Sequence, residues 1–143
     1  EGKEKTALLR FVKEYNLSNH VLFTGNVNDQ QKKQLFEYTT LMVMPTLDET
    51  QNRSIEGFGI TYMEAAFFGI PSIASRVGGT PEAVLHEKTG IIIDKHEQLF
   101  HALNDILLNK NKLVSLGENA RDRAEKSFTW EKVINNYLAV FKN

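Results

Sequence analysis

Two apolar patterns alternate over the first two thirds of the chain: short continuous runs, and stretches in which apolar residues recur at helical spacing. Short runs bounded by glycine or proline predict β-strands that are buried on both faces. The predicted strands span residues 21–24, 41–44, 70–74 and 90–93. The helical spacing between them predicts helices at residues 7–15, after a capping Asp29, at 60–68, and at 81–85 with Thr80 as the cap.

Only helices are predicted beyond residue 94. The first is marked by Leu99, Leu103, Ile106 and Leu107. A polar helix follows at about residues 113–126, and a last helix at about 129–141 has Thr129 as its cap. The last helix carries a wide apolar stripe that includes Trp130, Tyr137 and Phe141. We expect this stripe to exceed what the chain itself can cover.

Strand–helix alternation predicts an α/β fold, in which a parallel sheet carries helices on both faces. Right-handed crossovers then bring the carboxyl ends of the strands to one edge of the sheet, marked by Gly25, Pro45, Ser75 and Asp94. Four strands are few for such a sheet, and the chain opens on a helix. We therefore expect a fragment that is truncated at its N-terminus. A complete small domain with a short sheet is the alternative.

Composition narrows the classes of function. The chain has 143 residues, 41% hydrophobic and 24% charged, as in ordinary globular domains. The net charge is −1 without a basic stripe, so nucleic-acid binding is not predicted. Cysteine is absent and the four histidines lack a ligand spacing, so neither a disulfide nor a bound metal is expected. Without a long apolar run or a signal peptide in the first residues, we expect a cytoplasmic protein and leave peripheral membrane contact open.

The stretch from Glu56 to Glu64 holds the strongest candidate site. Glycines flank Phe58 on both sides and let the backbone approach a ligand closely. The helix predicted to begin near Ile60 has free amide donors at its N-terminus, which can bind sugar hydroxyls or a phosphate. Both glutamates can accept from hydroxyls, as a carboxylate does from a ribose diol. Taken singly, Glu64 is equally typical of a solvated helix residue, and Glu56 of a residue near a helix N-terminus that the helix dipole favours.

A second glycine motif, Gly78-Gly79-Thr80-Pro81, follows the third predicted strand. Its glycines permit a tight turn, and the helix after it would direct free amides at the strand-end edge, where a diphosphate would be stabilised. On its own, such a motif is more often a plain capped turn. Arg53 and Arg76 flank the two motifs and could contact a phosphate, although surface charge is the commoner role.

Further motifs accompany these two: Gly69-Ile70-Pro71, Val77–Glu82 and Thr89-Gly90. Together with Glu56–Glu64 they resemble the retaining glycosyltransferases of family 4, the group 1 class. These enzymes have the GT-B fold of two Rossmann-like domains, and the chain resembles the C-terminal, nucleotide-sugar-binding domain over nearly its whole length. The resemblance implies transfer of a sugar from a nucleotide-diphosphate donor to a hydroxyl acceptor, without a cofactor.

The resemblance also implies roles for individual residues. Glu56, the catalytic candidate, takes the place of the glutamate that contacts the donor sugar, and Glu64 that of the glutamate that holds the ribose. Asn26 and Val27 take the place of the main chain that cradles the base. The donor-binding set is completed by Gly57, Phe58, Gly59, Ile60, Gly78, Gly79 and Thr80.

Parts of the family pattern are missing. The basic residues that neutralise the diphosphate and the acceptor-side domain lie upstream in the family, so we do not expect this chain alone to be a competent catalyst. The last helix is expected to pack toward that N-terminal domain. Arg76, Phe67-Phe68 and His86-Glu87 depart from the residues usual at their positions. A non-catalytic nucleotide-sugar-binding module is the alternative function, followed by an epimerase of the same fold; the sequence identifies no acceptor.

Overall fold

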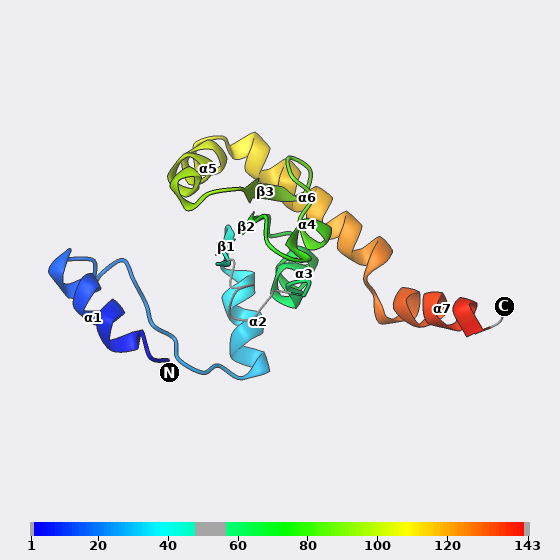
Figure 1. The fold of residues 1–143 in the computed structure, drawn as a ribbon, viewed down its shortest axis with the longest axis horizontal. Helices are drawn as coiled ribbons and strands as arrows, with labels where there is room; N and C mark the ends of the chain where they lie inside the picture. Colours follow the sequence, from blue (N-terminus) through cyan, green and yellow to red (C-terminus); the bar gives the residue numbers. More distant parts are fainter. Residues whose placement is uncertain (1, 48–56, 142–143) are drawn as a thin grey trace. The chain divides into compact units, whose positions relative to one another are not determined.

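The computed structural model describes residues 2–47 and 57–141. The chain divides into a small unit, Glu1–Leu35, and a larger unit, Phe36–Asn143. Each unit is described by itself, and Figure 1 labels the elements of both.

The small unit contains α1 (Lys5–Glu14), on which the rings of Phe11 and Tyr15 stack at 4.4 Å. The strand predicted at residues 21–24 is not formed, and the side chain of Leu22 is exposed. A parallel strand exists only where a neighbouring strand offers a ladder of hydrogen bonds, and the described residues provide no such ladder to this segment. The prediction of a strand here is therefore wrong.

The next helix, α2, spans Asp29–Glu37. Its cap is Asn28. We had predicted Asp29, and that prediction is wrong. The Asn28 side chain accepts a hydrogen bond from the Gln31 amide at 2.9 Å, while the Gln31 side chain accepts from the Asn28 amide at 3.0 Å. This reciprocal capping box satisfies two amides that the helix itself leaves without partners, which is why the helix starts here.

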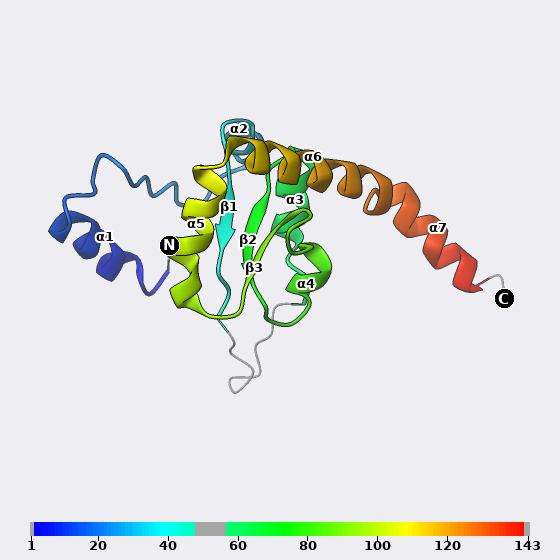
Figure 2. The same cartoon turned by 90° about the horizontal axis from the view of Figure 1, so that it is seen from above.

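The larger unit is built on a parallel sheet with the strand order β1-β2-β3 (Figure 2). The strands are β1 (Met42–Met44), β2 (Ser72–Ser75) and β3 (Gly90–Ile93). Ile73 of β2 pairs with Val43 on one side and with Ile91 on the other. The three later predicted strands and the parallel arrangement are thus confirmed.

The helices of the larger unit follow the predicted order. They are α3 (Ile60–Phe67), α4 (Thr80–Ala83), α5 (Leu99–Leu107), α6 (Lys110–Ser127) and α7 (Trp130–Phe141), with a short 3₁₀ helix η2 (His96–Gln98) before α5. Gly69 follows α3 with a φ of +72°, a left-handed conformation that suits glycine and ends the helix as predicted. The Thr129 hydroxyl accepts from the Lys132 amide at 3.4 Å, which agrees with its predicted capping role.

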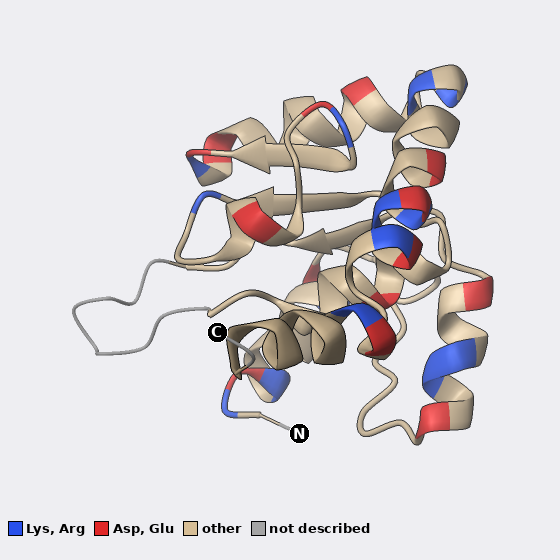
Figure 3. Cartoon of the chain, turned by 90° about the vertical axis from the view of Figure 1, so that its right-hand side faces the viewer, with Lys and Arg blue, Asp and Glu red and all other residues tan. Residues whose placement is uncertain are grey.

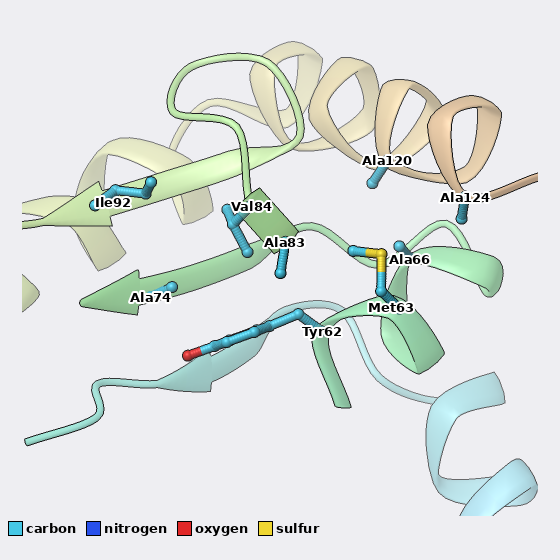
Figure 4. Packing of buried hydrophobic residues seen from close by; sticks show 9 residues of the cluster. All are labelled: Tyr62, Met63, Ala66, Ala74, Ala83, Val84, Ile92, Ala120 and Ala124. Atoms are coloured by element: carbon cyan, nitrogen blue, oxygen red, sulfur yellow. The ribbon is translucent and has the colours of Figure 1, made fainter. Parts of the chain in front are cut away.

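Both faces of the sheet are covered, as the sequence predicts. On one face, Ala74 and Ile92 pack against α3, α4 and the later turns of α6 (Figure 4). On the other face, strand residues pack against α5 and the first turns of α6. The strand residues of this second cluster are Ile73, Ile91 and Ile93. Residues alternate between the faces because successive side chains of a strand point in opposite directions.

The backbones of α3 and α6 approach each other closely where α3 ends. A Cβ atom placed on Gly117 of α6 would lie 2.2 Å from the carbonyl oxygen of Gly69 and 3.3 Å from Cδ of Pro71. A side chain at this position would therefore separate the two helices. The glycine fixes how closely α6 supports α3.

The last helix keeps its apolar stripe in solvent. Trp130 is 81% exposed, Tyr137 66% and Phe141 82%. This confirms the prediction that the stripe exceeds what the chain covers. No helix in the described part of the chain has the length and apolar character needed to cross a bilayer.

Charges of both signs are interspersed along the helices (Figure 3). On α6, for example, Arg121 pairs with Glu125 at 2.9 Å and Lys126 with Asp122 at 2.6 Å, each four residues apart. Such exposed pairs stabilise a helix by only a few tenths of a kcal/mol, about 0.3–0.5 each. The charge pattern agrees with the absence of a basic stripe in the sequence.

Candidate functional site

The first turn of α3 is anchored at the carboxyl end of β1. Tyr62 is only 1% exposed, and its hydroxyl donates to the carbonyl oxygen of Met44 at 2.6 Å. Gly59 precedes the helix with a φ of +84°, and a Cβ atom there would lie 2.4 Å from Cδ2 of Tyr62. Only glycine fits between the helix and its own tyrosine, so Gly59 sets where α3 begins.

The N-terminus of α3 presents amide donors at this anchored position. The first amides of an α-helix have no partner within the helix, and their partial positive charge attracts anions. The Tyr62 amide turns back to the carbonyl of Gly59 at 2.9 Å, whereas the side chain of Ile60, the first helical residue, is exposed. Among the described residues, no side chain caps the start of α3.

The two glycine motifs of the sequence lie in contact. A Cβ atom on Gly79 would lie 1.9 Å from the carbonyl oxygen of Gly57 and 3.3 Å from Cα of Phe58. The backbone of the turn after β2 thus packs directly on the loop before α3. The structure brings together residues 57–59 and Gly79, which the sequence analysis assigned to one site.

We had predicted that Thr80 caps α4, and this prediction is wrong. Gly79 occupies the N-cap position, and Thr80 is the first helical residue, with no exposed surface. Its hydroxyl lies within hydrogen-bond distance of the carbonyls of Ser75 and Val77, the latter at 2.9 Å. Because this hydroxyl bonds back to the end of β2, it holds the turn in shape, and a role for Thr80 in donor binding through its main chain stays a prediction.

Glu64 lies on the wall of a groove of about 730 Å³. Its side chain is half-buried, one turn after the start of α3. Apolar and aromatic residues from the loop before α3, α3 itself, the α6–α7 connection and α7 form the rest of the lining: Phe58, Ile60, Met63, Phe67, Phe128, Trp130, Val133 and Tyr137. A carboxylate on such a wall can accept hydrogen bonds from a hydroxyl-bearing ligand.

Other predicted site residues stay untested by the structure. Glu56 and Arg53 lie outside the described residues. Asn26 is exposed and Val27 is half-buried, both in the small unit. The predicted convergence of Glu56 with Glu64, and the predicted base-binding role of residues 26–27, therefore remain predictions.

Two arginines near the site are engaged by the protein itself. Arg76, after β2, bonds through Nε to Asp94 Oδ1 at 2.6 Å, and both side chains are exposed. Arg123 of α6 donates to the carbonyls of Glu82 and Ala83 at the end of α4. Burial lowers the pKa of Arg123 from its usual value, but the guanidinium group remains charged at neutral pH. Our sequence analysis missed Arg123, although its place between the inward-facing Ala120 and Ala124 was an available signal.

The turn at residues 86–87, one of the predicted departures from the family pattern, has an uncommon backbone conformation. Glu87 has a φ of +58°, a left-handed conformation that favours glycine. His86 accepts a hydrogen bond through Nδ1 from the amide of Ile92 at 3.0 Å and so covers part of the outer edge of β3. Across residues 2–47 and 57–141, no three His, Asp or Glu side chains form a group that could hold a metal ion.

Comparison with known proteins gives a consistent family. The family described as glycosyl transferases group 1 matches residues 1–123. The chain is 28% identical over 132 residues to a GDP-mannose-dependent alpha-(1-6)-phosphatidylinositol monomannoside mannosyltransferase of Mycobacterium tuberculosis, covering 91% of this chain and 34% of that protein. It is 30% identical over 147 residues to the N-acetyl-alpha-D-glucosaminyl L-malate synthase of Bacillus anthracis, with 99% and 35% covered.

Solved structures give the same fold. Sucrose-phosphate synthase from Thermosynechococcus elongatus superposes with a TM-score of 0.83 at 29% identity, covering 99% of this chain and 34% of that one. An Anabaena protein solved with UDP and glucose superposes with a TM-score of 0.81 at 22% identity, covering 96% and 36%. The predicted Rossmann-like domain of a GT-B protein is thus confirmed, and the alternative of a non-catalytic module is not favoured. The chain spans about a third of the length of the relatives it matches.

Proposed function

Because the chain belongs to the glycosyl transferases group 1 family, we propose that it is the donor-binding domain of a retaining glycosyltransferase. The whole enzyme transfers a hexosyl group from a nucleoside diphosphate sugar to a hydroxyl acceptor. The bond from the anomeric carbon to the diphosphate oxygen breaks, the bond to the acceptor oxygen forms on the same face, and the acceptor loses its proton. The rest of the polypeptide, the N-terminal GT-B domain, supplies the acceptor side.

The contact between Gly79 and Gly57 is the observation that carries this proposal. It holds the loop of residues 57–59 next to the N-terminus of α3, which has no side-chain cap among the described residues. The leaving diphosphate gains negative charge as the sugar departs, and oriented amides with a helix N-terminus stabilise such charge without reorganisation. The Anabaena protein of the same fold, which was solved with UDP and glucose, supports a nucleotide-sugar ligand.

The glutamates would hold the two ends of the donor. Glu64, on the groove wall, accepts from the ribose hydroxyls, and Glu56 orients the donor sugar for catalysis. Main-chain groups of Asn26 and Val27 contact the base. We assign neither glutamate as a nucleophile, because a glycosidase-type pair must flank one bond, whereas these two residues would bind different parts of one ligand.

The exposed stripe of α7 supports a contact with the proposed N-terminal domain. Trp130, Tyr137 and Phe141 together present a large apolar surface that a helix normally buries. We propose that the N-terminal domain covers it. The cytoplasmic location predicted from the sequence, with peripheral membrane contact, stays a prediction.

The test is donor binding by the full-length protein. Calorimetry with UDP-glucose and GDP-mannose should detect binding of at least one, and release of the free nucleoside diphosphate with an acceptor should show transfer. Glu64→Ala should weaken donor binding by about 1–3 kcal/mol, the cost of removing a charged hydrogen-bond partner. Glu118, exposed on α6 away from the groove, provides the control Glu118→Ala, whose affinity should match the wild type. Unchanged donor affinity in Glu64→Ala would refute the ribose contact.

A further inference from the structure

Arg123 makes an unusual set of contacts for an arginine near a surface. Its Nη1 donates to the carbonyl of Ala83 at 2.6 Å and its Nη2 to the carbonyl of Glu82 at 2.5 Å. The last carbonyls of a helix lack helical partners and carry partial negative charge, so a guanidinium group placed there both caps and stabilises the helix end. Arg123 therefore fixes the one-turn helix α4 to α6.

The helix that Arg123 caps leads back to the donor loop. Gly79 immediately precedes α4, and its backbone packs on Gly57 and Phe58 so closely that a methyl group would not fit. Because α4 has only one turn, a displacement of its end also moves its start. The position of Gly57 thus depends on the hydrogen bonds made by Arg123.

A second series of contacts reaches the same loop. The guanidinium carbon of Arg123 lies 4.7 Å from the centre of the Phe128 ring, within the range of a cation–π contact. The Phe128 ring in turn lies 5.6 Å from the Phe58 ring at an interplanar angle of 47°. The side chain of Phe58 and the backbone of Gly57 are therefore both supported, through different residues, by Arg123.

We propose that Arg123 is a positioning residue for the donor: by holding α4 behind Gly57 and the Phe128 ring against Phe58, it sets the loop of residues 57–59 for the sugar–diphosphate end of the ligand. The inference rests on the proposed function. It assigns a role to a side chain that touches no ligand itself. It also separates the two ends of the donor, because the hydrogen bonds of Arg123 go to the end of α4 and its ring contact goes to Phe128, the two supports of the loop.

The test uses Arg123→Met in the full-length protein, which keeps an apolar side chain against Phe128 and removes the donors to α4. Two ligands are compared: UDP-glucose or GDP-mannose, whichever the wild type binds, and the matching nucleoside, uridine or guanosine. We expect affinity for the nucleotide sugar to fall about tenfold or more, the equivalent of one lost charge-assisted hydrogen bond, and affinity for the nucleoside to stay within a factor of two. Glu64→Ala should instead weaken both ligands.

Two further variants keep the inference testable. Arg121→Met, two residues away on the exposed side of α6, removes an arginine whose partner is Glu125 on the same helix and should leave both affinities unchanged. Gly79→Ala should also weaken binding of the nucleotide sugar and not of the nucleoside, because the new methyl group moves Gly57 directly. This variant replaces Arg123→Met in the test if Arg123→Met fails to fold. Equal losses for nucleoside and nucleotide sugar, or a lower melting temperature with both affinities intact, would show a merely structural role. A wild type that binds no nucleotide sugar would overturn the proposed function instead.

Discussion

Gly117→Ala has two opposing effects of similar size on stability, and the contacts of Gly117 in the structure show which effect is larger. Glycine within a helix costs about 0.5–1 kcal/mol relative to alanine, so helix propensity alone predicts that the change stabilises α6. The new Cβ atom, however, would lie 2.2 Å from the carbonyl oxygen of Gly69. This neighbour is backbone and cannot rotate away, so α3 and α6 must separate. Overpacking of this kind costs about 1–3 kcal/mol. We therefore expect a net loss of about 1–2 kcal/mol in the free energy of unfolding.

Urea denaturation followed by far-UV circular dichroism measures this loss as a lower midpoint at an unchanged slope. Asn119→Ala is the matched control, because Asn119 is exposed two residues further along the same helix. There the propensity gain acts without a clash, and the midpoint should rise by the equivalent of about 0.5 kcal/mol. If Gly117→Ala is stabilised like the control, the close approach of α3 and α6 does not constrain this domain, and our account of how α3 is supported fails.

Two further predictions concern other supports of the site. Tyr62→Phe should lower the free energy of unfolding by about 1–2 kcal/mol, since it removes the hydrogen bond to the Met44 carbonyl. The control Tyr137→Phe, on the exposed face of α7, should change the free energy of unfolding by less than about 0.5 kcal/mol. Equal effects of the two substitutions would refute the anchoring of α3 to β1. The hydrogen bond from Lys112 to Asp105, and to a lesser extent the one to Glu87, raises the pKa of Lys112. Because the pKa is higher in the folded state, the charged lysine stabilises the fold fully below the unfolded pKa of about 10.4, and this contribution is lost as the pH rises through the folded pKa. The stability difference between wild type and Lys112→Met should accordingly be constant from about pH 7 to 9 and shrink above about pH 10.4, whereas a difference that persists at high pH would mean that packing, not charge, is responsible.

Three of the four strands predicted from the sequence are formed, and each of these has a neighbouring strand. The fourth prediction failed because the sequence pattern does not show whether a strand has a neighbour. The runs at 41–44, 70–74 and 90–93 pair with one another and form the sheet. The run at 21–24 is equally apolar, but apolarity describes burial and not hydrogen-bond partners, and in this chain the segment forms no ladder. A local pattern therefore cannot show whether an apolar run has a partner strand.

Caps and close contacts show the same limit at the level of single residues. Asp29 and Thr80 are both good N-cap residues, yet Asn28 and Gly79 take those positions. Asn28 prevails because Gln31 stands three residues later and completes a capping box. Thr80 is displaced because the end of β2 offers carbonyls for its hydroxyl, an interaction between segments that no local rule includes.

Three glycines are required in and behind the candidate site because a larger side chain would clash at their positions. Gly59 leaves room for Tyr62, Gly79 for Gly57, and Gly117 for the end of α3. The sequence analysis expected Gly59 to let the backbone approach a ligand and Gly79 to permit a tight turn, whereas the neighbours that require these two glycines in the structure are parts of the protein itself. Rigid contacts of this kind hold the amides at the start of α3 before a donor arrives, which is the condition for amides to stabilise developing charge without a cost of reorganisation. The same reasoning underlies our proposal that Arg123, which lies behind the loop, positions the loop for the donor.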